Sequence, residues 1–389
     1  MTPVARLSAA IEILDRILAG AAAEPALTNW GRANRFAGSG DRHALRDLVF
    51  DALRCRRSFA ALGGADSGRG LILGALRAAD IDPATRFTGL AHAPAPVLPG
   101  EIGRNPDPLE ALDCPDWLAP RLTASLGADF AAVMQALRQR APVFLRVNLA
   151  KTTCAAAMAA LAAEDIGVRR CDWVATALEV TGNARKIQTS RAYAEGLVEL
   201  QDAASQAVVA ALALRPGQTV LDYCAGGGGK TLTMAAYGTM PDAHDANPAR
   251  MRDLPQRAAR AGARVRLVES PAKTAPYDVI LTDVPCSGSG SWRRDPQGKW
   301  RLTEARLGEL LALQAQILDA VVPLLQPGGV LAYATCSLLA DENAAQIAAF
   351  LARHPGWHCL GQHRYSPLQG GDGFFLASLT RDPPQPTQL

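Results

Sequence analysis

The stretch Leu221-Asp-Tyr-Cys-Ala-Gly-Gly-Gly-Gly-Lys-Thr231 decides the fold of the C-terminal half of the chain. The residues before it, Thr219-Val-Leu-Asp, predict a strand, and the residues after it predict a helix. Glycines at such a strand-to-helix turn let the backbone bend sharply and pass close to a ligand. The stretch therefore favours a nucleotide-like ligand at the start of a helix.

Several identities for this loop remain open. A phosphate-binding loop, G-x-x-x-x-G-K-[ST], would need a glycine where Cys224 stands. A dinucleotide loop, G-x-G-x-x-G, fails at its third glycine, which is Thr231. The loop could also be a turn that binds nothing. An adenosyl cofactor fits best, and it calls for an acid at the end of the next strand to bind the ribose hydroxyls. Asp245 is the favoured acid and Asp242 its competitor, and either could be a solvated turn residue.

Strands and helices alternate on the C-terminal side of the loop. A strand is predicted over 278–283, a helix over 304–325, a turn at 327–329 and a strand over 330–335. This alternation predicts a doubly wound, mostly parallel sheet. Cys286 and Cys336 each follow one of these strands, and the carboxyl ends of parallel strands form the ligand crevice. A single cysteine is usually a buried small hydrophobe, but two at strand ends favour reactive thiols facing one cleft.

The N-terminal half has a different pattern. Apolar spacing predicts helices over 4–19 and 42–62, the second with Arg46, Arg54, Arg56 and Arg57 available on its outer face. Seven prolines between Phe87 and Pro120 predict a linker or extended arm that contains a domain boundary. A strand over 143–150, an alanine-rich helix over 154–163 and a strand at 178–180 predict a small α+β module.

Composition limits the class of protein. The 389 residues carry a net charge of only +3, although residues 1–60 hold nine Arg against six acidic residues, a modest footprint for a polyanion. The eight cysteines show no CxxC pair or zinc spacing, so we expect free thiols, no metal and a reducing cytoplasm. We expect no membrane span and no secretory signal. The tail, Pro383 to Leu389, is expected to fray.

Three motifs in order carry a family resemblance. After the glycine loop come Asp283-Val-Pro-Cys-Ser-Gly-Ser-Gly290 and Tyr333-Ala-Thr-Cys-Ser337, and the pair Glu342-Asn343 follows. Residues 196–381 resemble the RsmB/Sun family of RNA 5-methylcytosine methyltransferases, whose motifs are D-x-C-A-x-P-G-G-K-[ST], D-x-P-C-S-[GA]-[ST]-G and Y-[SA]-T-C-S. Two departures are visible. Gly227 replaces the loop proline, and Val268-Glu-Ser270 replaces a Gly-Asp pair that reaches the adenine.

The resemblance implies an architecture. It implies a Rossmann-like class I methyltransferase domain at 196–389 and a NusB-like, all-α RNA-binding domain at 1–86. Between them it implies a proline-rich linker with connecting helices at 87–135 and a small α+β module at 136–195. We expect a cytoplasmic monomer that uses S-adenosyl-L-methionine and binds RNA, with 16S ribosomal RNA ahead of transfer RNA as substrate.

The resemblance also assigns roles to residues. The catalytic set is Cys336 as nucleophile, Cys286 for release of the product, Asp283 beside the cytosine ring and Lys230 beside the thiolate. The cofactor set is Cys224, Ala225, Gly226, Gly227, Gly228, Gly229, Lys230, Asp245, Glu269 and Asp283. Trp300, Arg293, Arg294 and Arg301 could hold the RNA, although Trp300 could equally be a core residue.

Two rival hypotheses are considered, one within enzymes and one from a different class of protein. DNA cytosine methyltransferases place the nucleophile in the Pro-Cys motif and lack the Thr-Cys motif, so the presence of both favours RNA. A catalytically silent RNA-binding or assembly factor could keep the same fold. Retention of both cysteines together with Asp283 and Lys230 argues against that alternative.

Overall fold

The computed structural model describes residues 1–381, and its contacts divide the chain into two compact units. The first unit comprises Met1–Arg140 together with Trp292–Leu302, and the second comprises Ala141–Ser291 and the chain from Thr303 onward. The tail predicted to fray, Pro383 to Leu389, lies outside the described residues.

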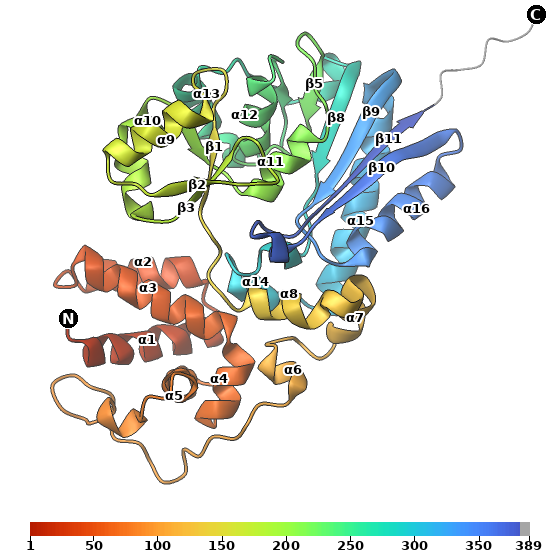
Figure 1. Ribbon diagram of the computed structural model, residues 1–389. Coiled ribbons are helices and arrows are strands. Elements are labelled where there is room, and N and C mark those ends of the chain that lie inside the picture. The colour runs from red at the N-terminus through yellow and green to blue at the C-terminus, as the bar shows by residue number, and fades with distance from the viewer. Residues whose placement is uncertain (382–389) are drawn as a thin grey trace, which may run out of the picture. The chain divides into compact units, whose positions relative to one another are not determined.

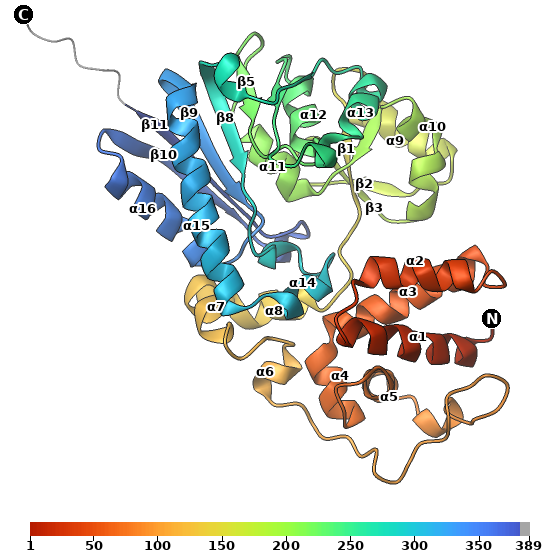
Figure 2. The ribbon, with the colours of Figure 1, turned by 180° about the vertical axis from the view of Figure 1, so that it is seen from behind.

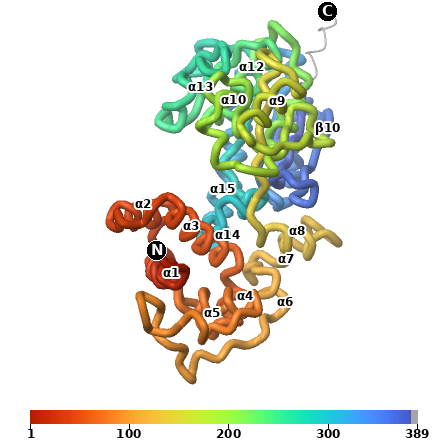
Figure 3. Tube along the Cα trace, turned by 60° about the vertical axis from the view of Figure 1, so that its left-hand side comes forward, coloured from red at the N-terminus to blue at the C-terminus, as the bar shows by residue number. Residues whose placement is uncertain are grey.

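The first unit is helical (Figure 3). Its first helix begins as the sequence dictates: Thr2 caps it by accepting a hydrogen bond from the Ala5 amide at 3.2 Å, and Pro3 occupies the first turn. Leu14, Leu45 and Leu71 from three different helices are fully or almost fully buried in one core. The helices are α1 (Pro3–Leu18), α2 (Ala23–Ala33), α3 (Ser39–Arg54), α4 (Arg56–Gly63), α5 (Gly68–Ala78), α6 (Pro108–Ala111), α7 (Ala119–Leu126), α8 (Phe130–Leu137) and α14 (Pro296–Arg301).

The single helix predicted over 42–62 is wrong. The chain leaves helical geometry at Cys55, with φ −108° and ψ 30°, and continues as α4 in a new direction. The reason is the packing of α4 against α5, which brings backbone against backbone. A Cβ added to Gly63 would lie 1.8 Å from the Gly70 carbonyl oxygen, and one added to Gly74 would lie 1.9 Å from that of Phe59. Periodicity within one helix carries no information about this contact.

The arginines predicted to lie free on the outer face are largely engaged. Arg54 is buried, and its Nε donates to the Arg293 carbonyl at 2.8 Å. Arg46 pairs with Glu24, and Arg56 and Arg57 pair with Asp66 and Asp116 at 2.7 Å. These four arginines therefore do not form the unpaired, exposed positive face that the sequence predicted.

The proline-rich segment is packed rather than free. Arg69 of α5 donates to the carbonyls of Ala95 and Pro96 at 3.0 and 2.9 Å, and the first unit continues through α8 to Arg140. The insert 292–302 also belongs to this unit, with α14 beside α3 in Figure 3. Trp300 donates its Nε1 to the Leu53 carbonyl at 2.6 Å, so its indole is committed to packing within the unit.

The second unit begins with a small antiparallel sheet of order β2-β3-β1-β4. Its strands are β1 (Phe144–Val147), β2 (Val168–Arg170), β3 (Ala177–Val180) and β4 (Val198–Leu200), with helices α9 (Cys154–Ala163) and α10 (Arg191–Ala194). The predicted strand, alanine-rich helix and strand all appear. The bounds of α9 match the sequence pattern because Thr153 caps its first turn.

The seven-stranded sheet that follows is mostly parallel, with order β10-β11-β9-β8-β5-β6-β7. β11 runs antiparallel to both of its neighbours, β10 and β9, and the other strand pairs are parallel. The chain starts at β5, builds β6 and β7 on one side, and then returns to place β8 and β9 on the other. The doubly wound prediction is confirmed. The strands are β5 (Val220–Asp222), β6 (Asp242–Ala243), β7 (Arg266–Leu267), β8 (Tyr277–Asp283), β9 (Leu325–Thr335), β10 (Trp357–Tyr365) and β11 (Phe374–Arg381).

Helices cover both faces of this sheet (Figures 1 and 2). Alternate residues of β8 show the two layers: Ile280 packs with Leu318 of α15 and Phe350 of α16, whereas Leu281 packs with Val208 of α11. By length and composition α15 with the turn after it could cross a membrane, but Leu318, Val321 and Leu324 of this segment are buried in the core of the sheet. The helices are α11 (Ala203–Ala210), α12 (Gly229–Ala236), α13 (Leu254–Ala261), α15 (Glu304–Val321) and α16 (Ala344–Arg353).

Candidate active site

The candidate site lies where β5, β8 and β9 end side by side. β8 pairs in parallel with both of the other strands, so the three carboxyl ends meet at one edge. The strand order reverses between β5 and β8, and ligands of doubly wound sheets bind at such a switch point. The predicted Cys224, Cys286 and Cys336 all follow these strands within three residues.

The glycine loop turns as the sequence predicts. Gly226 and Gly228 have φ of 53° and 79°, the left-handed region that favours glycine, and α12 begins at Gly229. A Cβ at Gly228 would lie 2.3 Å from Cδ1 of Leu254, so no other residue fits there without movement. Gly227 differs: its φ is not positive, and an added Cβ would meet only the flexible Arg257 side chain at 3.3 Å. Glycine in place of the family's proline at position 227 therefore adds no backbone strain.

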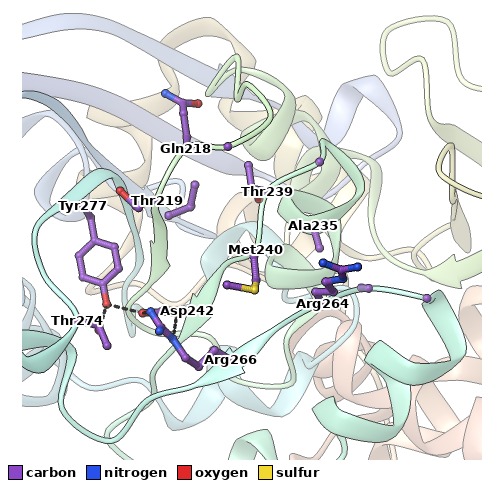
Figure 4. A pocket seen from close by; sticks show the side chains of 15 residues that line it. Gln218, Thr219, Ala235, Thr239, Met240, Asp242, Arg264, Arg266, Thr274 and Tyr277 are labelled. Atoms are coloured by element: carbon purple, nitrogen blue, oxygen red, sulfur yellow. Dashed lines mark hydrogen bonds and ion pairs between the residues drawn. The ribbon is translucent and has the colours of Figure 1, made fainter.

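The structure separates the two competing acids. Asp245 follows β6 at the carboxyl edge, where its Oδ2 accepts hydrogen bonds from the Gly226 amide at 2.9 Å and Arg250 at 3.0 Å. Asp242 lies at the start of β6 and faces a different cavity, of about 580 Å³, at the amino edge (Figure 4). Both its oxygens are taken there by Arg266, at 2.6 and 2.7 Å, and by the Tyr277 hydroxyl at 2.7 Å.

A cavity of about 480 Å³ opens beside Asp245 at the carboxyl edge. Its volume lies within the usual range for small-ligand sites. Apolar side chains form most of its wall, and Asp245, His244 and Glu269 supply polar groups: the lining is His244, Asp245, Ala246, Pro248, Met251, Arg252, Pro255, Leu267, Val268 and Glu269. Glu269 is exposed at this wall, where the resemblance places a contact to adenine.

These residues fit an adenosyl group. A carboxylate offers about four acceptor positions, and Asp245 uses three, for the amides of Gly226 and Asn247 and for Arg250. The Arg250 side chain is 56% exposed and can swing away, which leaves two positions for ribose hydroxyls. The apolar side chains of Pro248 and Met251 in the wall of the cavity suit an adenine ring.

Lys230 and Asp283 form an ion pair next to the thiols. Lys230 Nζ lies 2.8 Å from Asp283 Oδ2, and the lysine side chain is 10% exposed. Burial opposes the charge on Lys230, but the charge of Asp283 and its hydrogen bond, with a further contribution from Cys336, raise the pKa of the ammonium above its ordinary value. Lys230 therefore carries a positive charge beside this edge at neutral pH.

The two predicted cysteines come together. The Sγ atoms of Cys286 and Cys336 lie 3.4 Å apart, although 50 residues separate them in the chain. The hydrogen bond with Cys336, together with burial, raises the pKa of the Cys286 thiol well above its ordinary value. Burial also raises the pKa of Cys224, whose neighbour Ala225 donates its amide to the His244 carbonyl at 2.8 Å.

Sequence reasoning missed Asp222 as a site residue. It ends β5, is 1% exposed, and accepts a hydrogen bond from Thr231 at 2.6 Å on Oδ2. Its buried Oδ1 has no partner among the described residues. Burial raises its pKa to about 7. The available signal was its position as the last strand residue before the glycine loop. Buried acids with perturbed pKa values gather at functional sites.

The fold and this site define a Rossmann-like α/β methyltransferase. The model of the 16S rRNA methyltransferase RsmB/F family matches residues 209–380, and that of the RsmF/B-like ferredoxin-like domain matches residues 114–188. The chain belongs to the RsmB/F methyltransferase family. The second match begins within the first unit and covers most of the small antiparallel sheet.

Individual relatives agree with this family. Ribosomal RNA small subunit methyltransferase B of Salmonella arizonae is 36% identical over 288 residues, and that of Sodalis glossinidius is 36% identical over 296. Each match covers 69% of this chain and 66% of the relative, just under two thirds of the relatives' length. The crystal structure of PH0851 matches 98% of this chain and 99% of its own, with 25% identity and a TM-score of 0.77. NSun6 from Pyrococcus horikoshii, at 18% identity and a TM-score of 0.61, shares the fold over 69% of this chain and 98% of its own.

Proposed function

We propose that this protein is an S-adenosyl-L-methionine-dependent methyltransferase that modifies carbon 5 of a cytosine in RNA, with 16S ribosomal RNA as the preferred substrate. The observation that carries the proposal is the pair of thiols 3.4 Å apart at the ends of β8 and β9, beside the Lys230–Asp283 ion pair. The names of the relatives support ribosomal RNA as the substrate. Transfer RNA is the alternative.

Cys336 is the nucleophile of the proposed reaction. Carbon 5 of cytosine is a weak nucleophile, and addition of a thiolate at carbon 6 gives it enamine character. Lys230 favours the thiolate because it holds a positive charge close by: the charge of Cys336 is one of the groups that raise the pKa of Lys230, so the attraction is mutual. The target base must leave any stack, which favours a loop or an open segment of RNA.

Asp283 and Cys286 complete the proposed reaction. Asp283 uses Oδ2 for Lys230 and has Oδ1 left for the cytosine ring, where it would hold or exchange the proton at N3. After carbon 5 receives the methyl group, its proton passes to solvent water, and the electron pair of that C–H bond forms the carbon 5–carbon 6 double bond. The bond between Cys336 sulfur and carbon 6 breaks, which returns the thiolate. Cys286, 3.4 Å from Cys336, is placed to assist this release.

The cofactor set keeps its proposed role. The loop Cys224–Gly229 and Asp245 would hold the nucleoside, Glu269 would reach the adenine, and Lys230 and Asp283 would lie toward the reacting end. S-adenosyl-L-methionine supplies an electrophilic methyl group. The cavity of about 480 Å³ beside Asp245 supports this placement.

The helical unit offers a basic groove for the RNA. A cavity of about 670 Å³ between α2 and α3 is lined by Arg32 and Arg42 among others, and exposed Arg35 and Phe36 lie in the connecting loop. Within residues 1–381 these three arginines form no ion pair, whereas the nearby acids Glu24 and Asp41 are paired with Arg46 and Arg6. The groove therefore keeps an unbalanced positive charge for phosphates, and Phe36 offers a face on which a base can stack.

RNA binding tests the groove. The double variant Arg32→Ala/Arg35→Ala should weaken RNA binding about tenfold and lower the salt slope by about 2, because each arginine releases roughly one counterion per phosphate contact. Arg16→Ala, on the exposed and paired Arg16 of α1, is the matched control. An unchanged affinity in the double variant would remove the groove from the proposal.

Two experiments test the proposed reaction. Bisulfite sequencing of total RNA from cells with and without the protein should show one methylcytosine signal that depends on it, in 16S ribosomal RNA. A signal lost from transfer RNA would change the substrate, and no lost signal would refute the enzyme. In a denaturing gel, Cys286→Ala should accumulate a covalent protein–RNA adduct and Cys336→Ala should not. The reverse pattern would exchange the two roles.

A further inference from the structure

A buried carboxylate ties together the two loops that carry the cysteines. Glu342 is fully buried in the turn after β9, and its carboxylate accepts four hydrogen bonds. Oε1 accepts from the Ser287 amide at 2.8 Å and from Gln314 of α15 at 3.0 Å. Oε2 accepts from the hydroxyls of Ser287 and Ser337, each at 2.5 Å. Ser287 and Ser337 directly follow Cys286 and Cys336.

The rest of the network fixes the same two loops. Gln314 donates its Nε2 to the Pro285 carbonyl at 3.0 Å, so one side chain of α15 holds both the carboxylate and the residue before Cys286. Ser289 Oγ accepts from the Leu338 amide at 2.8 Å and lies 3.0 Å from Ser337 Oγ. Next to Glu342, Asn343 donates to the Ser337 carbonyl at 2.9 Å. Figure 2 shows β8, β9 and α15 side by side, which brings these loops together.

The carboxylate has no cationic partner. Within residues 1–381 no Lys, Arg or His forms an ion pair with Glu342, so an anion is buried on neutral donors alone. Burial of a charge without an ionic partner is costly, and a neutral side chain could fill the same space, so the retained charge points to a role beyond packing. The groups that face Cys286 from its neighbours are Cys336, Glu342 and the Tyr333 hydroxyl of β9. Lys230, in contrast, is the cation near Cys336.

We propose that Glu342 is a positioning residue whose carboxylate holds the two cysteine loops in register and makes the two thiols unequal. Its negative charge adds to the Cys336 contact and to burial in keeping the proton on Cys286, whereas the cation near Cys336 is Lys230. The two thiols lie 3.4 Å apart. The negative charge near Cys286 marks it as the release group, and the positive charge near Cys336 marks it as the nucleophile. The assignment of roles rests on the proposed methyl transfer, but the charge effect and the register do not.

Alkylation of the thiols tests the charge effect without RNA or cofactor. In a Cys336→Ala background, the rate at which iodoacetamide labels Cys286 is measured against pH by mass spectrometry of its peptide. Adding Glu342→Gln should lower the midpoint by about one pH unit and speed labelling at pH 8 about tenfold, because an anion near the thiolate has been removed. Glu309→Gln, on an exposed side chain of α15, is the matched control. An unchanged midpoint in a folded Glu342→Gln protein would overturn the charge effect.

Oxidation tests whether Glu342 holds the two cysteine loops in place. It uses a milder variant. With both cysteines present, diamide oxidises the two thiols to one disulfide and is itself reduced to the hydrazine. Ser337→Ala removes one of the four donors to Glu342 but keeps its charge. It should slow disulfide formation several-fold and leave the Cys286 alkylation midpoint unchanged. An unchanged oxidation rate would overturn the positioning role, even if Glu342→Gln did not fold. A protein that lacks methyltransferase activity but behaves as stated in both assays would refute the proposed function alone.

Discussion

The amino and carboxyl edges of the seven-stranded sheet carry cavities of comparable size. The polar groups at the two edges differ in how completely they are hydrogen-bonded. At the amino edge, around about 580 Å³, the polar groups are saturated: Asp242 is held by Arg266 and Tyr277, and Asp278 accepts from the Thr219 amide and hydroxyl at 2.7 and 2.8 Å. At the carboxyl edge, where a cavity of about 480 Å³ opens beside Asp245, polar groups at the neighbouring strand ends keep spare hydrogen-bonding capacity.

That spare capacity takes several forms at the carboxyl edge. Within the part of the chain that the structure describes, Asp222 has a buried oxygen without a partner. Asp283 has one oxygen that Lys230 does not use, and the two thiols lie in contact. A saturated group contributes to stability, whereas an unsaturated one is available to a ligand or a reaction. The comparison predicts that substitutions at the carboxyl edge change chemistry first and those at the amino edge change stability first.

Removal of the nucleophile should give the largest effect. Cys336→Ala should lower the rate of methyl transfer at least about 10³-fold, because no other group would form the bond to carbon 6. Met240→Ala, on a 54% exposed side chain at the amino edge, should stay within about twofold of the wild type. Transfer of a labelled methyl group to RNA measures both. A rate for Cys336→Ala close to that of Met240→Ala would end the distinction between the edges.

Two neighbouring glycines of the loop should respond differently. Gly228→Ala should cost about 2–4 kcal/mol of stability, because it combines a positive φ with the close approach of Leu254. Gly227→Ala should change stability by less than about 1 kcal/mol, since its φ is not positive and only Arg257 lies near. Urea unfolding measures both. Equal losses would mean that the loop does not need glycine at one position more than at the other.

The fold was largely predictable because it follows from local patterns. Strand β8 and helix α9 lie where alternation, apolar spacing and the Thr153 cap place them. The glycine loop and both cysteines could be predicted because the spacing of these motifs can be read directly from the sequence. The break at Cys55 was not predictable, because it depends on contact between glycines of α4 and α5. The burial of Arg54 depends on residue 293, far away in the chain.

The missed site residues share one physical reason. The role of Asp222 depends on complete burial, and that of Glu342 depends on serines from two loops that converge in space. The sequence alone also left Asp242 and Asp245 in competition, since only two residues separate them in the chain. Only the direction of the strand separates them, by placing one at each edge of the sheet.

The two acids of β6 give the most direct test of the comparison. Asp245→Asn should weaken S-adenosyl-L-methionine binding about tenfold, because charged hydrogen bonds to the ribose contribute roughly 1.5 kcal/mol. Asp242→Asn should leave that affinity within about twofold and lower the unfolding free energy by about 1–2 kcal/mol, since Arg266 is half exposed. Calorimetric titration and thermal unfolding measure the two quantities. Exchanged outcomes would move the cofactor to the amino edge.

Asp222 should show the smallest effect, visible as a pH dependence of stability. Its folded pKa, about 7, lies above the ordinary value of 3.8, so the folded state retains a proton that the unfolded state has lost between these values. The wild type therefore loses stability as pH rises through about 7, whereas Asp222→Asn has no carboxyl to titrate and its amide oxygen can still accept from Thr231. The variant should gain about 1–2 kcal/mol over the wild type at pH 8 and less at pH 5. Thermal unfolding at several pH values measures the gap, and a gap that does not widen with pH would mean that Asp222 is ionised in the folded protein throughout this range.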